Sequence, residues 1–336
     1  MTKYLSDKIT VLYTLLIIMV VYIHSYYLEA EQYETTEFIQ KFIGNSFRIA
    51  NCLFFCISGY LFARTIQNLK GVWEKQKKRF RTLLVPYILW NLIFVLWYVV
   101  LEVLPGLDRW VNSESVIDRF ASQSIWQTLY YLFVEPAAFQ LWFLRDLLVM
   151  AAFTPLWWWL AKKGKWIAIT LALASVFVYP WLVYYWLGII IAVHQWDIEH
   201  YPSSWAATAV GLIIYSGISW MYATGMEVPD WLSAFSNLTG LYALWHLYDL
   251  LVKGHIISNR GIWKYLCGYS FFIYCFHEPA FNIIKKLPVT IFGDSPVVLT
   301  FFYLVNPWIM VGVAVIIAQL LQRAVPGLYK TLTGGR

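Results

Sequence analysis

The chain has 336 residues, of which 60% are apolar or aromatic and only 13% are charged. A soluble globular protein carries about 25% charged residues, so this composition excludes an ordinary soluble fold. The 19 Trp and 24 Tyr residues fit the aromatic belts that membrane proteins place at lipid–water interfaces. We therefore predict an all-α membrane protein in which residues 1–336 form one polytopic domain, with membrane lipid and no nucleic acid among its partners.

Apolar runs long enough to cross a bilayer, which takes about 20 residues, recur along the chain. The short polar stretch before the first run is not followed by a signal-peptide cleavage site, so we expect the first run to remain as a spanning helix. We count about ten spans, with nine or eleven as alternatives, because two short runs share the turn at Tyr179-Pro180. In chain order the predicted spans cover residues 9–28, 46–66, 82–103, 139–161, 164–179, 180–195, 204–224, 231–252, 266–287 and 298–322.

The charges between these spans predict their orientation. With the N-terminus inside, 18 of the 25 Lys and Arg residues fall in cytoplasmic segments and 5 fall in outer segments. The positive-inside rule favours this arrangement, with both termini in the cytoplasm. The cytoplasmic segments are 1–8, 64–81, 162–165, 194–202, 253–264 and 323–336, and the outer ones are 29–45, 104–138, 225–230 and 285–297. Residues 124–138 are too few to span, so they are predicted to lie at the outer surface or to re-enter.

Ionisable side chains inside the predicted spans are candidates for function, because charge is expensive in lipid. The residues that stand out are His24, Arg48, Arg145, Asp146, His277 and Glu278. At about 1.5 Å per residue, His24 lies roughly 22 Å along the first span, and the others also fall in the outer half of the bilayer. Their common depth predicts one polar cavity. The alternative is that they form hydrogen bonds and ion pairs that only hold the helices together.

A basic segment precedes the third span. Residues 70–81 (KGVWEKQKKRFR) follow Arg64, and together they carry seven Lys and Arg residues. This charge could serve only orientation and attraction to anionic lipid, or it could bind the phosphates of coenzyme A. In the second interpretation the binding residues are Lys77, Lys78, Arg79 and Arg81. The sequence contains neither GxxxxGK[ST] nor GxGxxG, so it does not support an ordinary nucleotide-binding fold.

The four cysteines all lie in apolar segments, at positions 52, 56, 267 and 275. They show neither CxxC spacing nor a Cys/His set of metal ligands. We predict neither a disulfide framework nor a metal site.

Five segments resemble, in order, the motifs of acyltransferase family 3. FFCISGYLFAR (54–64) resembles its "FFxxSGYL" signature, and KKRFRTLLVPYILWN (77–91) resembles its basic segment leading into Pro-Tyr and a Trp. LWFLRDLL (141–148) and YYWLGIIIA (184–192) resemble its "LWFLxxL" motif and its glycine-containing helix. SFFIYCFHEP (270–279) resembles its "SxxIYLxHxP" motif. The matches extend over nearly the whole chain.

This resemblance implies an enzyme of about ten helices in the bacterial inner membrane. Such enzymes move acyl groups, commonly acetyl from acetyl-CoA, to hydroxyls of cell-surface glycans, lipid-linked sugars or other envelope molecules. It therefore implies acyl-CoA as a co-substrate, acetyl or succinyl being open, and no tightly bound cofactor. The residues predicted to bind substrate are Arg48, Ser58, Tyr60, Trp142 and Tyr274.

The family's first helix carries an Arg and, after ten residues, a His. His24 occupies the His position, but Tyr13 stands at the Arg position, and Lys8 is five residues too early to replace it. Thr82 similarly stands where the basic segment usually has an Arg. Arg145 is a candidate partial substitute for the lost charge.

Acyl transfer from a thioester to a hydroxyl needs a base and positive groups for the oxyanion. We predict His24 as the base or as the acyl carrier, with Arg145 or Arg48 as the positive group. Asp146 or Glu278 would orient His24 or one of the arginines. His277 is a second candidate catalyst.

Three other functions fit parts of the pattern. A transporter or flippase could use the same polar cavity, although the chain lacks the matching halves that many transporters show. A glycosyltransferase acting on lipid-linked sugars would usually need a DxD pair, which the outer loops lack. A membrane scaffold would not explain polar residues at one depth.

Overall fold

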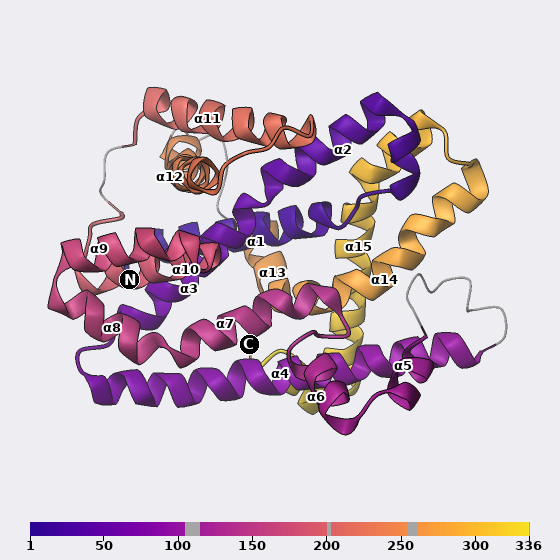
Figure 1. Ribbon diagram of the computed structural model, residues 1–336, viewed down its shortest axis with the longest axis horizontal. Helices are drawn as coiled ribbons and strands as arrows, with labels where there is room; N and C mark the ends of the chain where they lie inside the picture. Colours follow the sequence, from indigo (N-terminus) through magenta and orange to yellow (C-terminus); the bar gives the residue numbers. More distant parts are fainter. Residues whose placement is uncertain (105–114, 200–202, 254–260, 336) are drawn as a thin grey trace.

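The computed structural model describes residues 1–104, 115–199, 203–253 and 261–335, and in these ranges every regular element is a helix. The predicted loops at 104–138, 194–202 and 253–264 therefore lie partly outside the described residues. Figure 1 shows the long helix α4 along one edge, with α1, α3 and α10 in the middle. The helices are α1 (Lys3–Ile23), η1 (Leu28–Gln32), α2 (Glu34–Phe47), α3 (Ile49–Ala63), α4 (Leu69–Val103), α5 (Val116–Ser122), α6 (Ile125–Phe133), η3 (Phe139–Leu141), α7 (Trp142–Ala152), α8 (Thr154–Lys163), α9 (Lys165–Ala174), η4 (Ser175–Phe177), α10 (Pro180–Val193), α11 (Trp205–Ala223), α12 (Asp230–Lys253), α13 (Ile262–Cys267), α14 (Ser270–Phe292), α15 (Pro296–Ala324) and α16 (Pro326–Leu332).

Five helices in the described part of the chain are long and apolar enough to cross a membrane. They are α1, the α2–α3 pair taken as one helix, α4, α11 and α15. A sixth candidate joins Phe139–Ala152 to Thr154–Lys163 across a bend of 54°. The prediction of an all-helical membrane protein is thus confirmed, while the number of ten spans stays a prediction.

Several predicted boundaries differ from the structure. The outer segment 285–297, for example, is helical as far as Phe292, the end of α14. Residues 29–45, expected as an outer loop, form η1 and α2, so the second span begins well before residue 46. The predicted span 139–161 is bent because Pro155 stands at the start of α8. A proline has no backbone N–H to donate and favours the first turn of a new helix.

The basic segment 70–81, expected as a loop, forms the first turns of the 35-residue helix α4. Asn68 caps this helix, its side chain accepting a hydrogen bond from the backbone N–H of Gly71 at 2.9 Å. Because the segment is helical, its basic residues are sorted onto different faces by the period of 3.6 residues. This sorting decides which of them can reach the interior.

Two glycines let α3 and α10 pack backbone against backbone. A Cβ atom at Gly59 of α3 would overlap the carbonyl oxygen of Tyr185, and a Cβ at Gly188 of α10 would overlap that of Cys56. Small residues permit such close approach between membrane helices. The glycine in the 184–192 motif is therefore required by packing.

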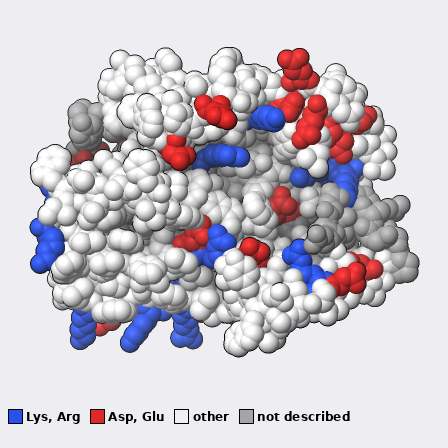
Figure 2. Space-filling view, viewed as in Figure 1, with Lys and Arg blue, Asp and Glu red and all other residues white. Residues whose placement is uncertain are grey.

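Charged side chains gather at separate places on the face drawn in Figure 2. Acidic side chains cover the upper right, where Figure 1 draws η1 and α2. These two helices carry Glu29, Glu31, Glu34 and Glu37. Basic side chains lie along the lower left, below the first half of α4.

Candidate functional site

Two histidines and a glutamate meet where the end of α1 packs against α14. His24 is the residue that ends α1, and its Nδ1 atom lies 3.2 Å from Oε1 of Glu278. The ring centroids of His24 and His277 are 5.0 Å apart. The side chains of His24 and Glu278 remain 15% and 19% exposed, whereas His277 is completely buried. We call these three residues the histidine cluster.

The neighbours of each imidazole determine which of its nitrogens carries the proton. A carboxylate only accepts hydrogen bonds, so Glu278 favours the proton on Nδ1 of His24 and the lone pair on Nε2. Nδ1 of His277 lies 2.8 Å from the carbonyl oxygen of Tyr274, which requires a proton on that nitrogen too. Nε2 of His277 has no hydrogen-bond partner among the described residues. Both rings can therefore present an unprotonated nitrogen, as a general base must.

Lys285 of α14, which was not among the sequence-predicted residues, lies beside the histidine cluster. Its Nζ atom donates a hydrogen bond to the carbonyl oxygen of His24 at 3.0 Å. A cation at the end of a helix stabilises the unsatisfied carbonyl groups there. Lys285 follows Glu278 by seven residues, which is two turns along the same helix face. This spacing is the signal by which the sequence could have identified it.

A cavity of about 590 Å³ lies between α1, α3, α4, α7 and α14. Most of its lining is apolar, and the polar side chains include Tyr13, Asn51, Ser58 and Tyr274. The ring of Tyr274 lies 6.3 Å from that of His277, measured between centroids, so the cavity reaches the neighbourhood of the histidine cluster. We call this space the α1–α4 cavity.

The α1–α4 cavity follows α1 for most of the length of that helix. The α1 residues that line it extend from Ile9 to Val20, a distance of about 17 Å at the helical rise of 1.5 Å per residue. Val20 precedes His24 by one helical turn. One end of the cavity therefore points toward the histidine cluster.

Three basic residues of α4, namely Lys75, Lys78 and Arg79, line the cavity. Lys75 donates to the carbonyl oxygen of Phe62 at 2.8 Å, and Arg79 Nη1 donates to that of Ser58 at 3.2 Å. These contacts place the basic side chains against the last turns of α3. We call the three residues the basic mouth.

The direction of α3 shows where the basic mouth lies. Tyr13 packs against Phe54 with ring centroids 5.1 Å apart, and Tyr22 packs against Phe47 at 5.4 Å. The residue numbers fall along α2 and α3 as they rise along α1, so α1 and the α2–α3 pair are antiparallel. The last turns of α3 therefore lie beside the start of α1. The basic mouth is at the opposite end of the cavity from His24.

The sequence prediction for the basic segment needs revision in its residues. Lys78 and Arg79 line the cavity as proposed for a cofactor site, but Lys77 and Arg81 are exposed and do not line it. Lys75 does line it and was missed. Residues 75, 78, 79 and 82 share one helix face at intervals of three and four, whereas 77 and 81 lie on another. A helical reading of the segment could have identified Lys75.

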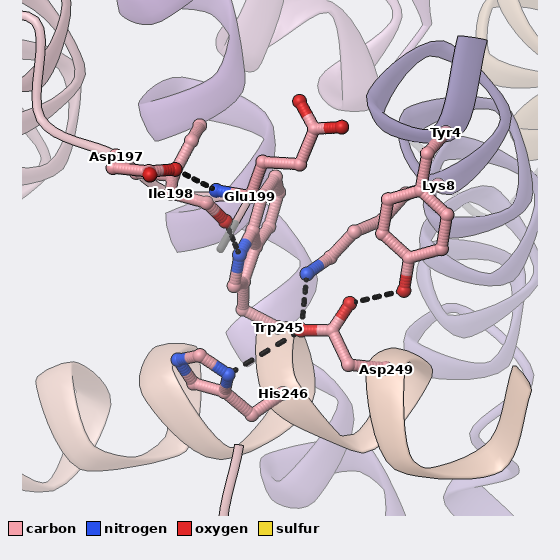
Figure 3. Close-up of polar contacts among 8 residues, drawn as sticks. All are labelled: Tyr4, Lys8, Asp197, Ile198, Glu199, Trp245, His246 and Asp249. Atoms are coloured by element: carbon pink, nitrogen blue, oxygen red, sulfur yellow. Dashed lines mark hydrogen bonds and ion pairs between the residues drawn. The ribbon is translucent and has the colours of Figure 1, made fainter. Parts of the chain in front are cut away.

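Lys8 does not replace the arginine whose position Tyr13 occupies. Figure 3 shows the Lys8 ammonium held by Asp249 of α12, at 2.8 Å, with the Trp245 ring centroid 3.9 Å away. Tyr4 donates a hydrogen bond to the same carboxylate at 2.6 Å. Lys8 is therefore engaged between α1 and α12, while Tyr13 lines the cavity.

Arg145 and Asp146 pair with each other. Arg145 Nη2 lies 2.8 Å from Asp146 Oδ1, and Arg145 Nη1 donates to the carbonyl oxygen of Val134 at 2.6 Å. Tyr179 donates a hydrogen bond to the other oxygen of Asp146. Among the described residues this network links α7 to the end of α6 and to the start of α10, and it does not contact His24. The geometry favours the bundle-holding interpretation of these two residues.

The predicted substrate-binding residues separate into two groups. Ser58 and Tyr274 line the α1–α4 cavity, and Tyr274 also donates to the carbonyl oxygen of Gln140 at 2.5 Å. Trp142 packs on Trp181, with centroids 5.5 Å apart. Arg48 is exposed at the junction of α2 and α3, and the Tyr60 ring lies 5.8 Å from the guanidinium carbon of Arg64. Arg48, Tyr60 and Trp142 are not among the described residues that line the cavity.

The arrangement combines a pair of imidazole rings, a long apolar passage and a positively charged end. Within the described residues no group of three or more His, Cys, Asp and Glu side chains could hold a metal ion. The basic mouth and the apolar lining of the α1–α4 cavity instead suit a substrate with an anionic end and a slender apolar arm. The reacting atom of such a substrate would lie near the histidine cluster.

The chain is similar to known proteins over most of its length. The chain is 26% identical to the succinoglycan biosynthesis protein ExoH of Rhizobium meliloti (strain 1021) over 354 aligned positions, covering 98% of this chain and 92% of that protein. No solved structure matches the chain significantly. Residues 7–321 match a family described as an acyltransferase domain, a range that contains the histidine cluster and the basic mouth. The chain therefore belongs to acyltransferase family 3.

Proposed function

We propose that this protein moves an acyl group, acetyl in the first instance, from cytoplasmic acyl-CoA to a hydroxyl of a cell-envelope glycan or lipid-linked sugar. In this proposal it crosses the bacterial inner membrane about ten times with both termini in the cytoplasm. The basic mouth binds the phosphates of coenzyme A. The histidine cluster performs the transfer at the outer end of the α1–α4 cavity.

One observation carries the proposal: the cavity has cations at one end and an imidazole pair near the other. Lys75, Lys78 and Arg79 supply charge for phosphate oxygens, for which charge-assisted hydrogen bonds are strong. The apolar passage along α1 from Ile9 to Val20 suits the pantetheine arm. This arm would bridge the depth between a cytoplasmic donor and an outer acceptor.

The proposed chemistry conserves atoms and protons. Nε2 of His24 takes the proton of the acceptor hydroxyl while the hydroxyl oxygen attacks the thioester carbonyl carbon. A C–O ester bond forms, the C–S bond breaks, and the imidazolium returns its proton to the departing thiolate to give free coenzyme A. Glu278 stabilises the imidazolium between these two proton transfers, as the carboxylate does in a catalytic triad. An acyl-histidine relay would give the same balance in two displacements.

The relative ExoH supports the choice of acceptor. Its name assigns it to succinoglycan biosynthesis, and this chain aligns with 92% of its length. A polysaccharide or its lipid-linked precursor is therefore the acceptor that we propose for this chain.

The test is transfer of radiolabelled acetyl-CoA by membranes that contain the protein, with the label followed into polysaccharide. His24→Ala should lower transfer by at least about a hundredfold, since general-base catalysis contributes about 10²–10⁴-fold. His194→Ala is the matched control, because His194 ends α10 and lies outside the histidine cluster. Full transfer by His24→Ala would disprove the base assignment. Movement of glycan across the membrane without release of free coenzyme A would favour a transporter.

A further inference from the structure

The binding of acyl-CoA proposed above does not use a second pocket, which α5 and α6 form. It has a volume of about 950 Å³ and belongs to the segment predicted to lie at the outer surface. Among the described residues, the ten that line it are all polar or aromatic, and none of them is aliphatic. They include Asp118, Arg119, Gln123, Trp126, Tyr130 and Glu135. We call this space the α5–α6 pocket.

We propose that the α5–α6 pocket binds the oligosaccharide part of the acceptor, a few sugar residues away from the hydroxyl that is acylated. This proposal rests on the function proposed above and adds to it the place and manner of acceptor binding. A sugar presents apolar C–H faces and a rim of hydroxyls. Aromatic rings cover the first, and carboxylate, amide and guanidinium groups bond the second.

The lining residues are available for this role. Trp126 is 77% exposed and Tyr130 is 53% exposed, so both rings present area that a ligand could cover. Asp118 and Glu135 offer acceptors to sugar hydroxyls, and Gln123 offers both donors and acceptors. Two carboxylates also make the pocket unfavourable for an anionic lipid headgroup.

The residues of α6 that line the pocket lie on a different face of the helix from its exposed aliphatic residue Ile125. Trp126, Gln127, Tyr130 and Tyr131 line the pocket. Ile125 is 66% exposed and does not line it. An interfacial helix that serves only as an anchor would direct its aromatic residues toward lipid. Here the lining aromatics face a polar space, while an aliphatic side chain remains on another face.

The pocket is held together before any ligand binds. The side chain and backbone of Ser124 and Gln127 form a capping box that fixes the first turn of α6. Ser115 at the start of α5 donates to Glu102 at 3.0 Å, which ties α5 to the end of α4. Phe120 of α5 packs on Tyr131 of α6 with ring centroids 5.8 Å apart. Such preorganisation lowers the cost of ordering side chains on binding.

The chain between Glu135 and Phe139 places the pocket close to the histidine cluster. Glu135 lines the pocket, and Phe139, four residues later, lies 6.2 Å from the His24 ring. Four residues of chain span at most about 14 Å. An oligosaccharide could therefore occupy the pocket while one of its hydroxyls reaches His24.

Because the pocket lies away from the reacting bond, substitutions in it should change the kinetic constants for the acceptor and not those for acyl-CoA. An interaction with a remote part of the substrate that is equally strong in the ground state and the transition state changes KM and leaves kcat unchanged. Removing one stacking ring from a binding site costs about tenfold in kcat/KM. The KM for acyl-CoA, which depends on the basic mouth, should stay at its wild-type value.

The test uses the full-length protein in membranes with acetyl-CoA and polysaccharide isolated from the cells that make it. Trp126→Ala should lower kcat/KM for the polysaccharide about tenfold through a higher KM, and Trp126→Phe should recover most of the loss. Ile125→Ala, on the same helix but outside the pocket, should behave as wild type. Tyr130→Leu provides a second variant that keeps apolar bulk, with the same expected rise in KM.

Wild-type kinetics in both Trp126→Ala and Tyr130→Leu would overturn the proposal. An equal loss in Ile125→Ala and Trp126→Ala would also overturn it, because it would identify the surface as a lipid contact. If the wild-type protein transfers no acetyl to any envelope fraction, the proposed function itself fails. The two failures are therefore distinguishable.

Discussion

Glu278→Gln is the substitution that tests the histidine cluster most directly. It keeps the volume and hydrogen-bonding capacity of the side chain but removes the charge beside His24. We expect slower acyl transfer, because the imidazolium formed when His24 takes the hydroxyl proton loses its counter-charge.

The magnitude follows from the 3.2 Å between His24 Nδ1 and Glu278 Oε1. At that distance two unit charges attract by about 5 kcal/mol at an effective dielectric constant of 20 and by about 1.3 kcal/mol in bulk water. The two side chains are 15% and 19% exposed, so their environment lies between these limits. A loss of about 2.5 kcal/mol lowers kcat/KM about 70-fold.

The assay is steady-state acetyl transfer by Glu278→Gln, His24→Ala and the double variant. Because Glu278 acts through His24, the double variant should be no slower than His24→Ala alone. A further 70-fold loss in the His24→Ala background would refute the reasoning, since Glu278 would then contribute independently. Retention of full activity by Glu278→Gln would refute it as well.

Three more predictions concern the fold and the basic mouth. Gly188→Ala should lower the free energy of unfolding in detergent by about 2 kcal/mol or more, because the added methyl group overpacks against α3. Gly217 has open space around it, so Gly217→Ala should be neutral or slightly stabilising. Thermal melts of the two variants test this difference. Arg79→Ala should raise the KM for acetyl-CoA about tenfold by removing one charged hydrogen bond, and Lys77→Ala should leave this KM within about twofold of wild type. Equal effects of the two substitutions would contradict the assignment of Arg79, and not Lys77, to the cavity face of α4. Lys8→Met should lower the free energy of unfolding by about 3–5 kcal/mol, because the buried carboxylate of Asp249 keeps its hydrogen bond from Tyr4 but loses its ammonium counter-charge; an unchanged melting temperature would show that this ion pair is unimportant.

Part of the candidate site was predictable because membrane proteins restrict where charge can lie. His24, His277 and Glu278 stand out in apolar runs, and the sequence predicted that they share one polar cavity with Arg48, Arg145 and Asp146. The structure brings these three together at hydrogen-bonding and ring-contact distances. Depth alone could not separate them from Arg145 and Asp146, for which the sequence predicts a similar depth but which pair with each other.

The sequence by itself determined the class of the molecule, an all-helical membrane protein, because apolar composition and run length leave no soluble alternative. Only the tertiary structure decided which charges serve which purpose. Lys75 faces the cavity and Lys77 does not, because a helix rotates successive side chains by about 100° and only packing shows which face is inside. Lys8 is bound to Asp249, which is distant in sequence, and no local pattern contains that pairing. The sequence shows which residue in a span is charged, but the residue that pairs with it depends on which helices become neighbours.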